Sequence, residues 1–183
     1  MHPAQRHRLP IRFAAIVAIA LGALLSWQHL HGGVPSHSFL ARKDYPSISN
    51  WWGLLLLPAL TWGTSVVVLR RGSSTEAGAE RRALTLGAGA LIYGAAMAFS
   101  FAIGAEQVTG VLFPAMPLLA LIWPTYRAEA LLGFVLGMSY TFGAVLPTFI
   151  GTVVVLISAV VHLGIRPWLL RLGLALLSAT RSP

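Results

Sequence analysis

Histidines gather in one polar stretch of an otherwise apolar chain. Half of the six histidines, His29, His31 and His37, lie in the segment 28–50, which also contains Asp44. Neutral imidazoles and a carboxylate are ligands that Zn²⁺ and similar divalent cations accept. An extended backbone would put residues two apart on one face, and two following glycines offer a turn back toward them. The segment is therefore a candidate site for zinc or another divalent metal.

A plainer interpretation of the same residues involves no metal. The spacing of the three histidines matches no established zinc motif. His29 and His31 would then be interfacial residues at the end of the first helix, while Asp44 pairs with Arg42 or Lys43. We favour this interpretation and keep the metal site as its alternative.

Three further residues are candidates for binding a solute together with His37 and Asp44. Asn50 and Trp51 precede an apolar run, where an N-cap and an aromatic belt are the simpler interpretation. Glu106 either caps the fourth helix or completes a site with the loop histidines. The candidate substrate-binding set is His37, Asp44, Asn50, Trp51 and Glu106.

Composition limits the class of protein. Of 183 residues, 56% are hydrophobic and 10% charged, against about 25% charged in an ordinary soluble domain. The formal charge of +8 comes from short basic clusters between apolar stretches, which are typical of a polytopic membrane protein and not of a nucleic-acid-binding surface. The chain has no cysteine, which excludes disulfides and thiolate metal sites. We expect membrane lipids as partners, and no nucleic acid.

Length arithmetic predicts six membrane-spanning helices. A crossing needs about 20 apolar residues at 1.5 Å each, so the 44 residues from Ala83 to Tyr126, with Glu106 near their middle, must fold back near 104–107. The 36 uncharged residues from Ala130 to Ile165 must also fold back, with Pro147 near the centre. We predict an all-α, six-helix integral membrane bundle forming a single domain, with helices at residues 11–29, 51–69, 83–104, 107–125, 129–146 and 148–166.

The distribution of basic residues predicts the orientation. With the N-terminus inside, eleven Lys and Arg fall on the cytoplasmic side and two on the external side, a strong positive-inside signal. We expect both termini to be cytoplasmic in a multi-pass, bacterial-type inner membrane protein. A cleaved signal peptide over the first 27 residues is the competing interpretation; its long apolar run favours a helix instead.

Prolines and small residues suggest how the bundle packs. Pro114 and Pro117 predict a fourth helix that is kinked or partly unwound, and transporters use such breaks to bind solutes. Residues 167–178 either extend the sixth helix or lie along the inner interface after a bend at Pro167. Small residues allow close helix contact, within the chain or against a partner subunit or second copy; the candidate stripes are Ala14, Ala18 and Gly22, and Gly133 and Gly137.

The first helix also carries a resemblance. Ala14 and Ala18, together with the six-helix layout, resemble the substrate-binding subunits of energy-coupling-factor uptake systems, in which an Ala-x-x-x-Ala stripe docks the partner. The resemblance implies solute binding and partner docking at those two alanines. It extends to the layout and includes no substrate motif.

The apolar spans carry no acid or base at depth, which argues against a proton pump, a voltage sensor or a retinal protein. We find no phosphate loop or dinucleotide fingerprint. The sequence therefore favours binding or transport of a small solute through an extracytoplasmic-facing site. A metal-dependent enzyme acting on a lipid at the outer interface, or an accessory subunit of a larger complex, are the alternatives.

The predicted orientation is tested by reporter fusions. A reporter placed after Leu40 should be extracytoplasmic, and reporters at Ser74 and at the C-terminus should be cytoplasmic, because the arginine clusters stay inside. Enzymatic assay of paired reporters that are active on opposite sides of the membrane measures this. An external Ser74 would overturn the orientation.

Overall fold

The computed structural model describes residues 3–34, 36–38, 47–72 and 78–171. Six helices lie close to the predicted positions. Two three-residue strands and a 3-10 turn, which the sequence analysis does not predict, precede the second helix. The elements are α1 Pro3–Leu30, β1 Ser36–Ser38, β2 Ser47–Ser49, η2 Asn50–Trp52, α2 Gly53–Gly72, α3 Ala79–Ala102, α4 Glu106–Ile122, α5 Ala128–Phe142, α6 Val145–Ala159 and the π-helical turn η3 Val160–Ile165.

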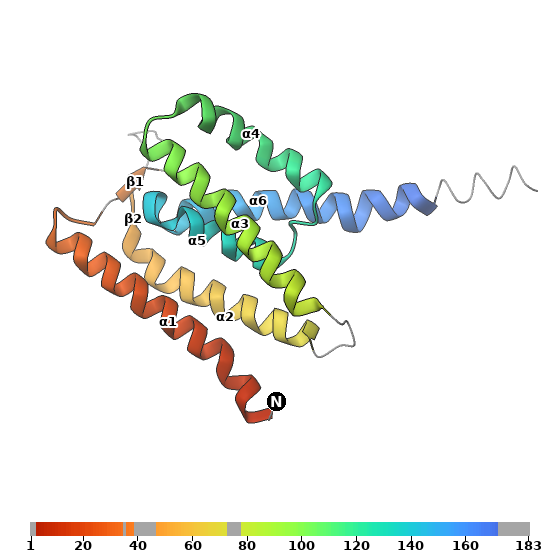
Figure 1. Ribbon diagram of the computed structural model, residues 1–183, viewed down its shortest axis with the longest axis horizontal. Coiled ribbons are helices and arrows are strands. Elements are labelled where there is room, and N and C mark those ends of the chain that lie inside the picture. The colour runs from red at the N-terminus through yellow and green to blue at the C-terminus, as the bar shows by residue number, and fades with distance from the viewer. Residues whose placement is uncertain (1–2, 35, 39–46, 73–77, 172–183) are drawn as a thin grey trace, which may run out of the picture.

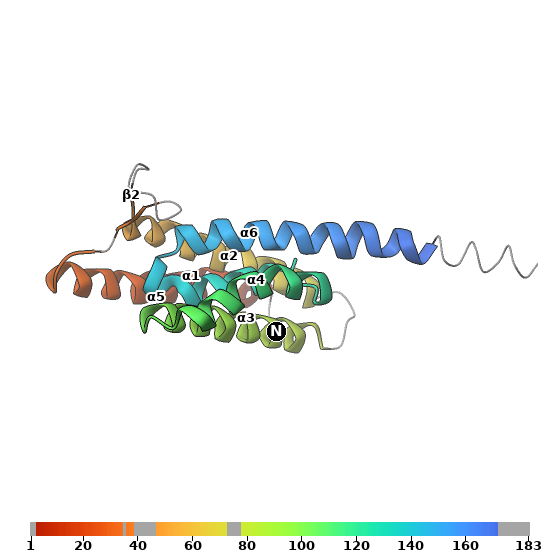
Figure 2. The same ribbon diagram turned by 90° about the horizontal axis from the view of Figure 1, so that it is seen from above.

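The helices run side by side between two ends (Figures 1 and 2). The strand end holds the antiparallel pair of β1 and β2, the α3–α4 turn and the α5–α6 turn. The arginine end holds the α4–α5 turn and the adjoining ends of α2 and α3. The sixth helix continues through η3 to Arg171 and extends beyond the other helices at the arginine end.

Four helical stretches are long and apolar enough to cross a membrane: Arg8–Leu30, Asn50–Arg71, Ala79–Ala102 and Val145–Arg171. α4 and α5 are apolar but shorter, with 17 and 15 residues, or about 26 and 22 Å against a hydrocarbon core of about 30 Å. The described chain is therefore predominantly helical, with four candidate membrane spans and two shorter apolar helices.

Both predicted hairpins form, but one turns at a different residue. Gly104, with φ +70°, turns the chain between α3 and α4 as expected. The second turn was expected around Pro147, whereas α5 already ends at Phe142 and Gly143 takes φ +67°. Pro147 lies instead in the first turn of α6, where a proline removes no intrahelical hydrogen bond. Glycine, which tolerates positive φ, thus determined the turn.

α4 is one uninterrupted helix through Pro114 and Pro117, so it is not unwound. Of the two forms predicted from the sequence, the kinked helix stays a prediction. Of the two alternatives for residues 167–178, the described part shows an extension of the sixth helix, which continues through Pro167 to Arg171; residues 172–178 lie outside the described residues. The π-helical turn directly precedes Pro167. A wider turn there accommodates the proline ring, which would clash with the carbonyl four residues earlier in a regular helix.

Glycines bring α3 and α5 into backbone contact, and this is the most extensive helix pair in the described chain. A Cβ atom at Gly133 would overlap the carbonyl oxygen of Gly87, and one at Gly137 would overlap that of Leu91. From the opposite side, a Cβ at Gly94 would lie 2.6 Å from the Phe134 oxygen. Gly133 and Gly137 therefore serve internal packing, one of the two uses that the sequence analysis considers.

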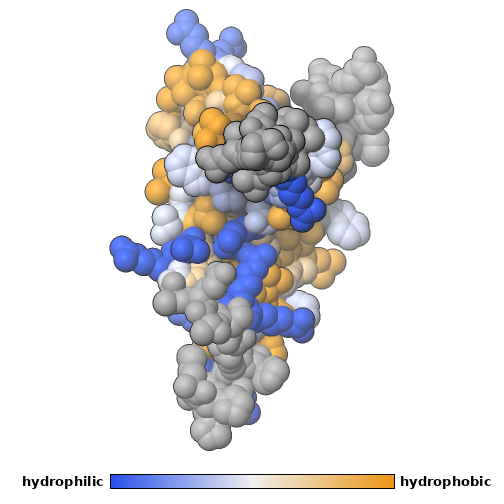
Figure 3. Space-filling view, turned by 90° about the vertical axis from the view of Figure 1, so that its right-hand side faces the viewer, coloured by the Kyte–Doolittle hydropathy of each residue, from blue (hydrophilic) through white to orange (hydrophobic). Residues whose placement is uncertain are grey.

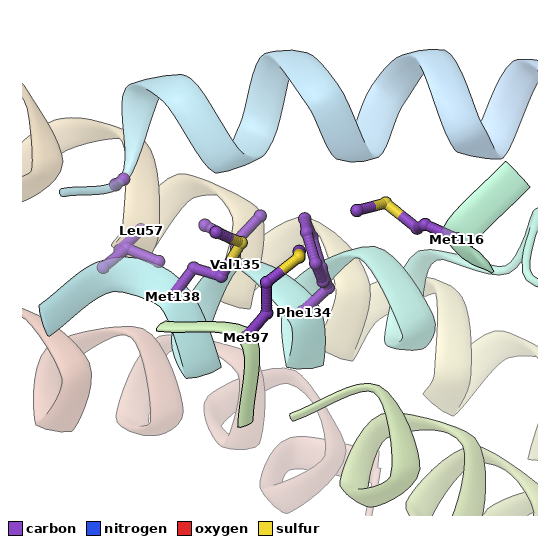
Figure 4. Close-up of a cluster of buried hydrophobic side chains, with 7 residues drawn as sticks. Leu57, Met97, Met116, Phe134, Val135 and Met138 are labelled. Atoms are coloured by element: carbon purple, nitrogen blue, oxygen red, sulfur yellow. The ribbon is translucent and has the colours of Figure 1, made fainter. Parts of the chain in front are cut away.

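A cluster of buried side chains surrounds this contact (Figure 4). Phe134, Val135 and Met138 of α5 pack with Leu57 of α2, while methionines contribute from α3 and α4. Unbranched methionine side chains fill the irregular gaps that closely spaced helices leave. The core thus joins α2, α3, α4 and α5.

The small-residue stripe of α1 lies toward α2. Ala14, Ala18 and Gly22 are partly buried on the same face as the fully buried Leu25. A Cβ on Gly22 would lie 3.8 Å from Leu54 of α2. Docking of a partner subunit on this stripe stays a prediction.

Adding one methyl group at the α3–α5 contact tests its importance. Gly133→Ala or Gly137→Ala should lower the free energy of unfolding by about 1–3 kcal/mol or more, because the helices must separate. Denaturation in mixed detergent micelles measures this. Gly89→Ala is the matched control, since nothing lies within 4 Å of a Cβ there. Equal stability of all three variants would contradict the contact.

Candidate functional site

The predicted metal-binding histidines at the strand end make aromatic contacts. The ring of His31 stacks on Trp27 with centroids 4.7 Å apart, and its Nδ1 lies 2.8 Å from the Trp27 carbonyl oxygen. That nitrogen must donate, because a carbonyl only accepts. His29 meets the edge of Trp51 at 6.3 Å. These contacts are the ones that an interfacial role would produce.

The remaining metal candidates are only partly described. His37 lies in β1, paired in register with Ile48, and Asp44 lies outside the described residues. Within the described part of the chain, no three His, Asp or Glu residues gather as a metal site would require. The zinc site at the strand end stays a prediction.

Asn50 and Glu106 occupy different settings at the strand end. Ser49, not Asn50, caps the 3-10 turn, accepting from the Trp51 N–H at 3.4 Å. Asn50 is 7% exposed, and its side chain fills the space that the missing Cβ of Gly143 leaves. Glu106 is exposed in the first turn of α4, where a carboxylate suits the positive end of the helix dipole. The Asn50 side chain therefore packs against Gly143 in the α5–α6 turn.

A cavity lies between α3, α4, α5 and α6, nearer the arginine end. Its volume of about 350 Å³ falls within the usual range of about 300–1,000 Å³ for ligand pockets. Its lining is Thr85, Leu86, Gly89, Ala90 and Tyr93 of α3; Met116, Leu119 and Trp123 at the end of α4; Thr125; Ala130, Leu131 and Phe134 of α5; and Gly151, Val154 and Val155 of α6.

The cavity is apolar because most of its few hydroxyl groups are hydrogen-bonded to backbone carbonyl oxygens. The Tyr93 hydroxyl donates to the Leu112 carbonyl oxygen at 2.5 Å, and the Thr85 hydroxyl donates to that of Arg81 at 2.9 Å. Among the hydroxyl groups of the lining, only that of Thr125 has no hydrogen-bond partner in the described structure. Such a cavity favours hydrocarbon over a charged solute.

Helix spacing explains why the cavity exists. The glycine contact draws α3 onto α5, while α4 is joined to α3 nearer the strand end by the Tyr93 bond and by Ser100 and Thr109, whose oxygens are 3.0 Å apart. Toward the arginine end, α3 presents Gly89, which has no side chain to fill the gap. Gly89 and Trp123 are exposed, so the cavity opens sideways between α3 and α4.

A buried carboxylate lies next to this cavity. Glu129, in the first turn of α5, has a side chain only 6% exposed. The Arg71 guanidinium at the end of α2 donates to both of its oxygens at 3.3 and 3.4 Å, and Arg127 lies 3.8 Å away. The sequence analysis does not name this pair among its site residues. It joins α2 to α5, because an unpaired buried carboxylate would be costly.

Comparisons of the chain with known protein families, with curated proteins and with solved structures return no match. The cavity is a candidate site that the sequence analysis does not predict. Its available signals were Tyr93 and a run of small residues, Gly87, Gly89 and Ala90, on one helix. Nothing in that run shows that α4 would lie apart from it.

Removing the buried carboxylate tests the α2–α5 link. Glu129→Ala should lower the free energy of unfolding by about 1–3 kcal/mol. This is less than the cost of breaking a fully buried ion pair, because the Arg71 side chain is 42% exposed and stays partly solvated. Chemical denaturation in micelles measures it. Glu80→Ala, an exposed acid in the first turn of α3, should cost well under about 1 kcal/mol. A Glu129 variant as stable as the Glu80 variant would show that the pair contributes nothing.

Proposed function

We propose that this chain is a membrane protein that binds a small apolar or amphipathic solute in the cavity between α3, α4, α5 and α6. One observation carries the proposal: a ligand-sized, apolar cavity inside a membrane bundle, opening sideways between two helices. Ligand sites in helical bundles lie between helices and are lined mainly by apolar groups. A lateral opening suits a solute that enters from the lipid.

This proposal keeps the solute-binding class expected from the sequence but places its site elsewhere. The sequence analysis centres the site on the loop histidines, whereas the cavity lies nearer the arginine end. Binding alone or binding coupled to transport both fit such a cavity. Coupling would need a partner subunit, for which the stripe on α1 remains the candidate surface.

We further propose that all six helices are embedded in a cell membrane, with the strand end external and both termini cytoplasmic. Supporting this are the alternating helix directions and the arginines, which gather where α2 ends and α3 begins. The shorter α4 and α5 would then span only part of the bilayer thickness, or thin it locally. The cavity would face the inner leaflet.

A cavity-filling substitution tests the proposed site. Dodecanol carrying a diazirine should label the segments 116–131 and 151–155 saturably, and Gly89→Leu should abolish that labelling by occupying the cavity. Mass spectrometry of the photolabelled peptides in lipid nanodiscs measures this.

Gly110→Leu is the matched control. It makes the same change on α4, at an exposed glycine that does not line the cavity and whose Cβ would meet nothing within 4 Å. Labelling should persist in this variant. Labelling spread evenly over the lipid-facing helices and unchanged by Gly89→Leu would refute the site.

A further inference from the structure

A small polar cluster that the apolar binding site does not use adjoins the arginine end of the cavity and reaches it through Thr125. Thr125 lines the cavity, and the next residue, Tyr126, faces the ring of His162 with centroids 6.1 Å apart. His162 belongs to the π-helical turn η3, one turn after Ser158, whose hydroxyl donates to the Trp123 carbonyl oxygen at 3.2 Å. Such π-helical turns occur often at functional positions.

The hydrogen bonds of His162 determine which of its nitrogens carries hydrogen. Arg166 Nη1 lies 3.3 Å from His162 Nδ1. A guanidinium can only donate, so Nδ1 accepts and the neutral ring carries its hydrogen on Nε2. That Nε2 is buried and has no partner in the described structure. A donor is therefore held in place with nothing to accept from it.

Thr125 has a second unpaired group of this kind. Its Oγ1 is buried and makes no hydrogen bond within the described residues. A rotation about its Cα–Cβ bond can turn the hydroxyl toward the cavity without breaking any hydrogen bond. Unpaired buried donors are unfavourable, and a ligand oxygen that accepts from them removes this penalty.

The charge around the cluster is positive. Arg166 contacts His162 directly, and hydrophilic side chains gather across the middle of this end of the molecule, among hydrophobic ones (Figure 3). The nearby described arginines are Arg81, Arg82, Arg127 and Arg166, while the neighbouring carboxylate, Glu129, already faces Arg71 and Arg127. Oxygen acceptors that carry negative charge are favoured over neutral ones in such a setting.

We propose that the ligand is an anionic amphiphile, whose apolar chain fills the cavity and whose carboxylate or phosphate is held by Thr125, His162 and Arg166. This inference rests on the proposed function, because it needs the chain to occupy the cavity. It adds the chemistry of the ligand head group. A fatty acid and a phosphate monoester share this chemistry.

Three photoreactive dodecyl probes that differ only in the head group test the proposal: an alcohol, a carboxylate and a monophosphate. In neutral-lipid nanodiscs at pH 8, at least one anionic probe should half-saturate cavity labelling at about a tenfold lower concentration than the alcohol, the value of one charge-assisted hydrogen bond. The anionic probe that is preferred shows whether the ligand is a fatty acid or a phosphate monoester. Arg166→Gln should remove the preference and leave labelling by the alcohol unchanged, and Thr125→Val should reduce the preference.

Arg171→Gln is the control, because it removes the same charge from the same helix beyond the cluster. It should keep the preference; an equal loss in both arginine variants would assign the preference to general surface charge and overturn the head-group site. Equal half-saturation by all three probes, with labelling still in the cavity, would also overturn it and leave the proposed function intact. Absence of saturable labelling by any probe would refute both.

Discussion

The backbone contact between α3 and α5 is the constraint on which the other features depend. Lipid offers helices no hydrophobic reason to associate, so close packing of small residues has to hold a membrane bundle together. Gly94 of α3 and Gly133 and Gly137 of α5 each lie too close to the backbone of the facing helix to carry a Cβ. The pair forms a rigid centre, against which α2 packs through the buried cluster and α4 and α6 pack from other sides.

The same contact creates the proposed site. Because α3 is drawn onto α5, the more loosely attached α4 does not fill the space beside them toward the arginine end. Glycine thus has two uses on α3: Gly94 allows close contact with α5, and Gly89 leaves space beside α4. Burying an unpaired charge is unfavourable, and the buried Glu129 carboxylate accordingly lies beside the guanidinium groups of Arg71 and Arg127.

Much of the fold could be predicted from the sequence, because apolar run length and turn residues are local signals. Six helices and the turn at Gly104 follow from them. The turn at Gly143 and the continuous α4 could not be predicted as easily, since proline alone does not say whether a helix starts, bends or continues there. The strand pair was missed because three-residue strands carry no periodic pattern.

The site was harder to predict than the fold. The sequence drew attention to histidines, which are conspicuous in an apolar chain, and two of them prove to contact tryptophans. The cavity depends on the spacing of four helices, which no local pattern encodes. His162 is one polar residue in a long apolar run, and its unpaired nitrogen is visible only once Arg166 and Tyr126 are placed around it.

The most direct test of the account is an experimentally determined structure of the chain in lipid nanodiscs, at a resolution that shows side chains and bound lipid. The account predicts α3 and α5 in backbone contact at their glycines, with elongated density in the space between α3 and α4 that reaches toward Thr125 and His162. Direct packing of α4 along the whole of α3, with no space and no density between them, would contradict it.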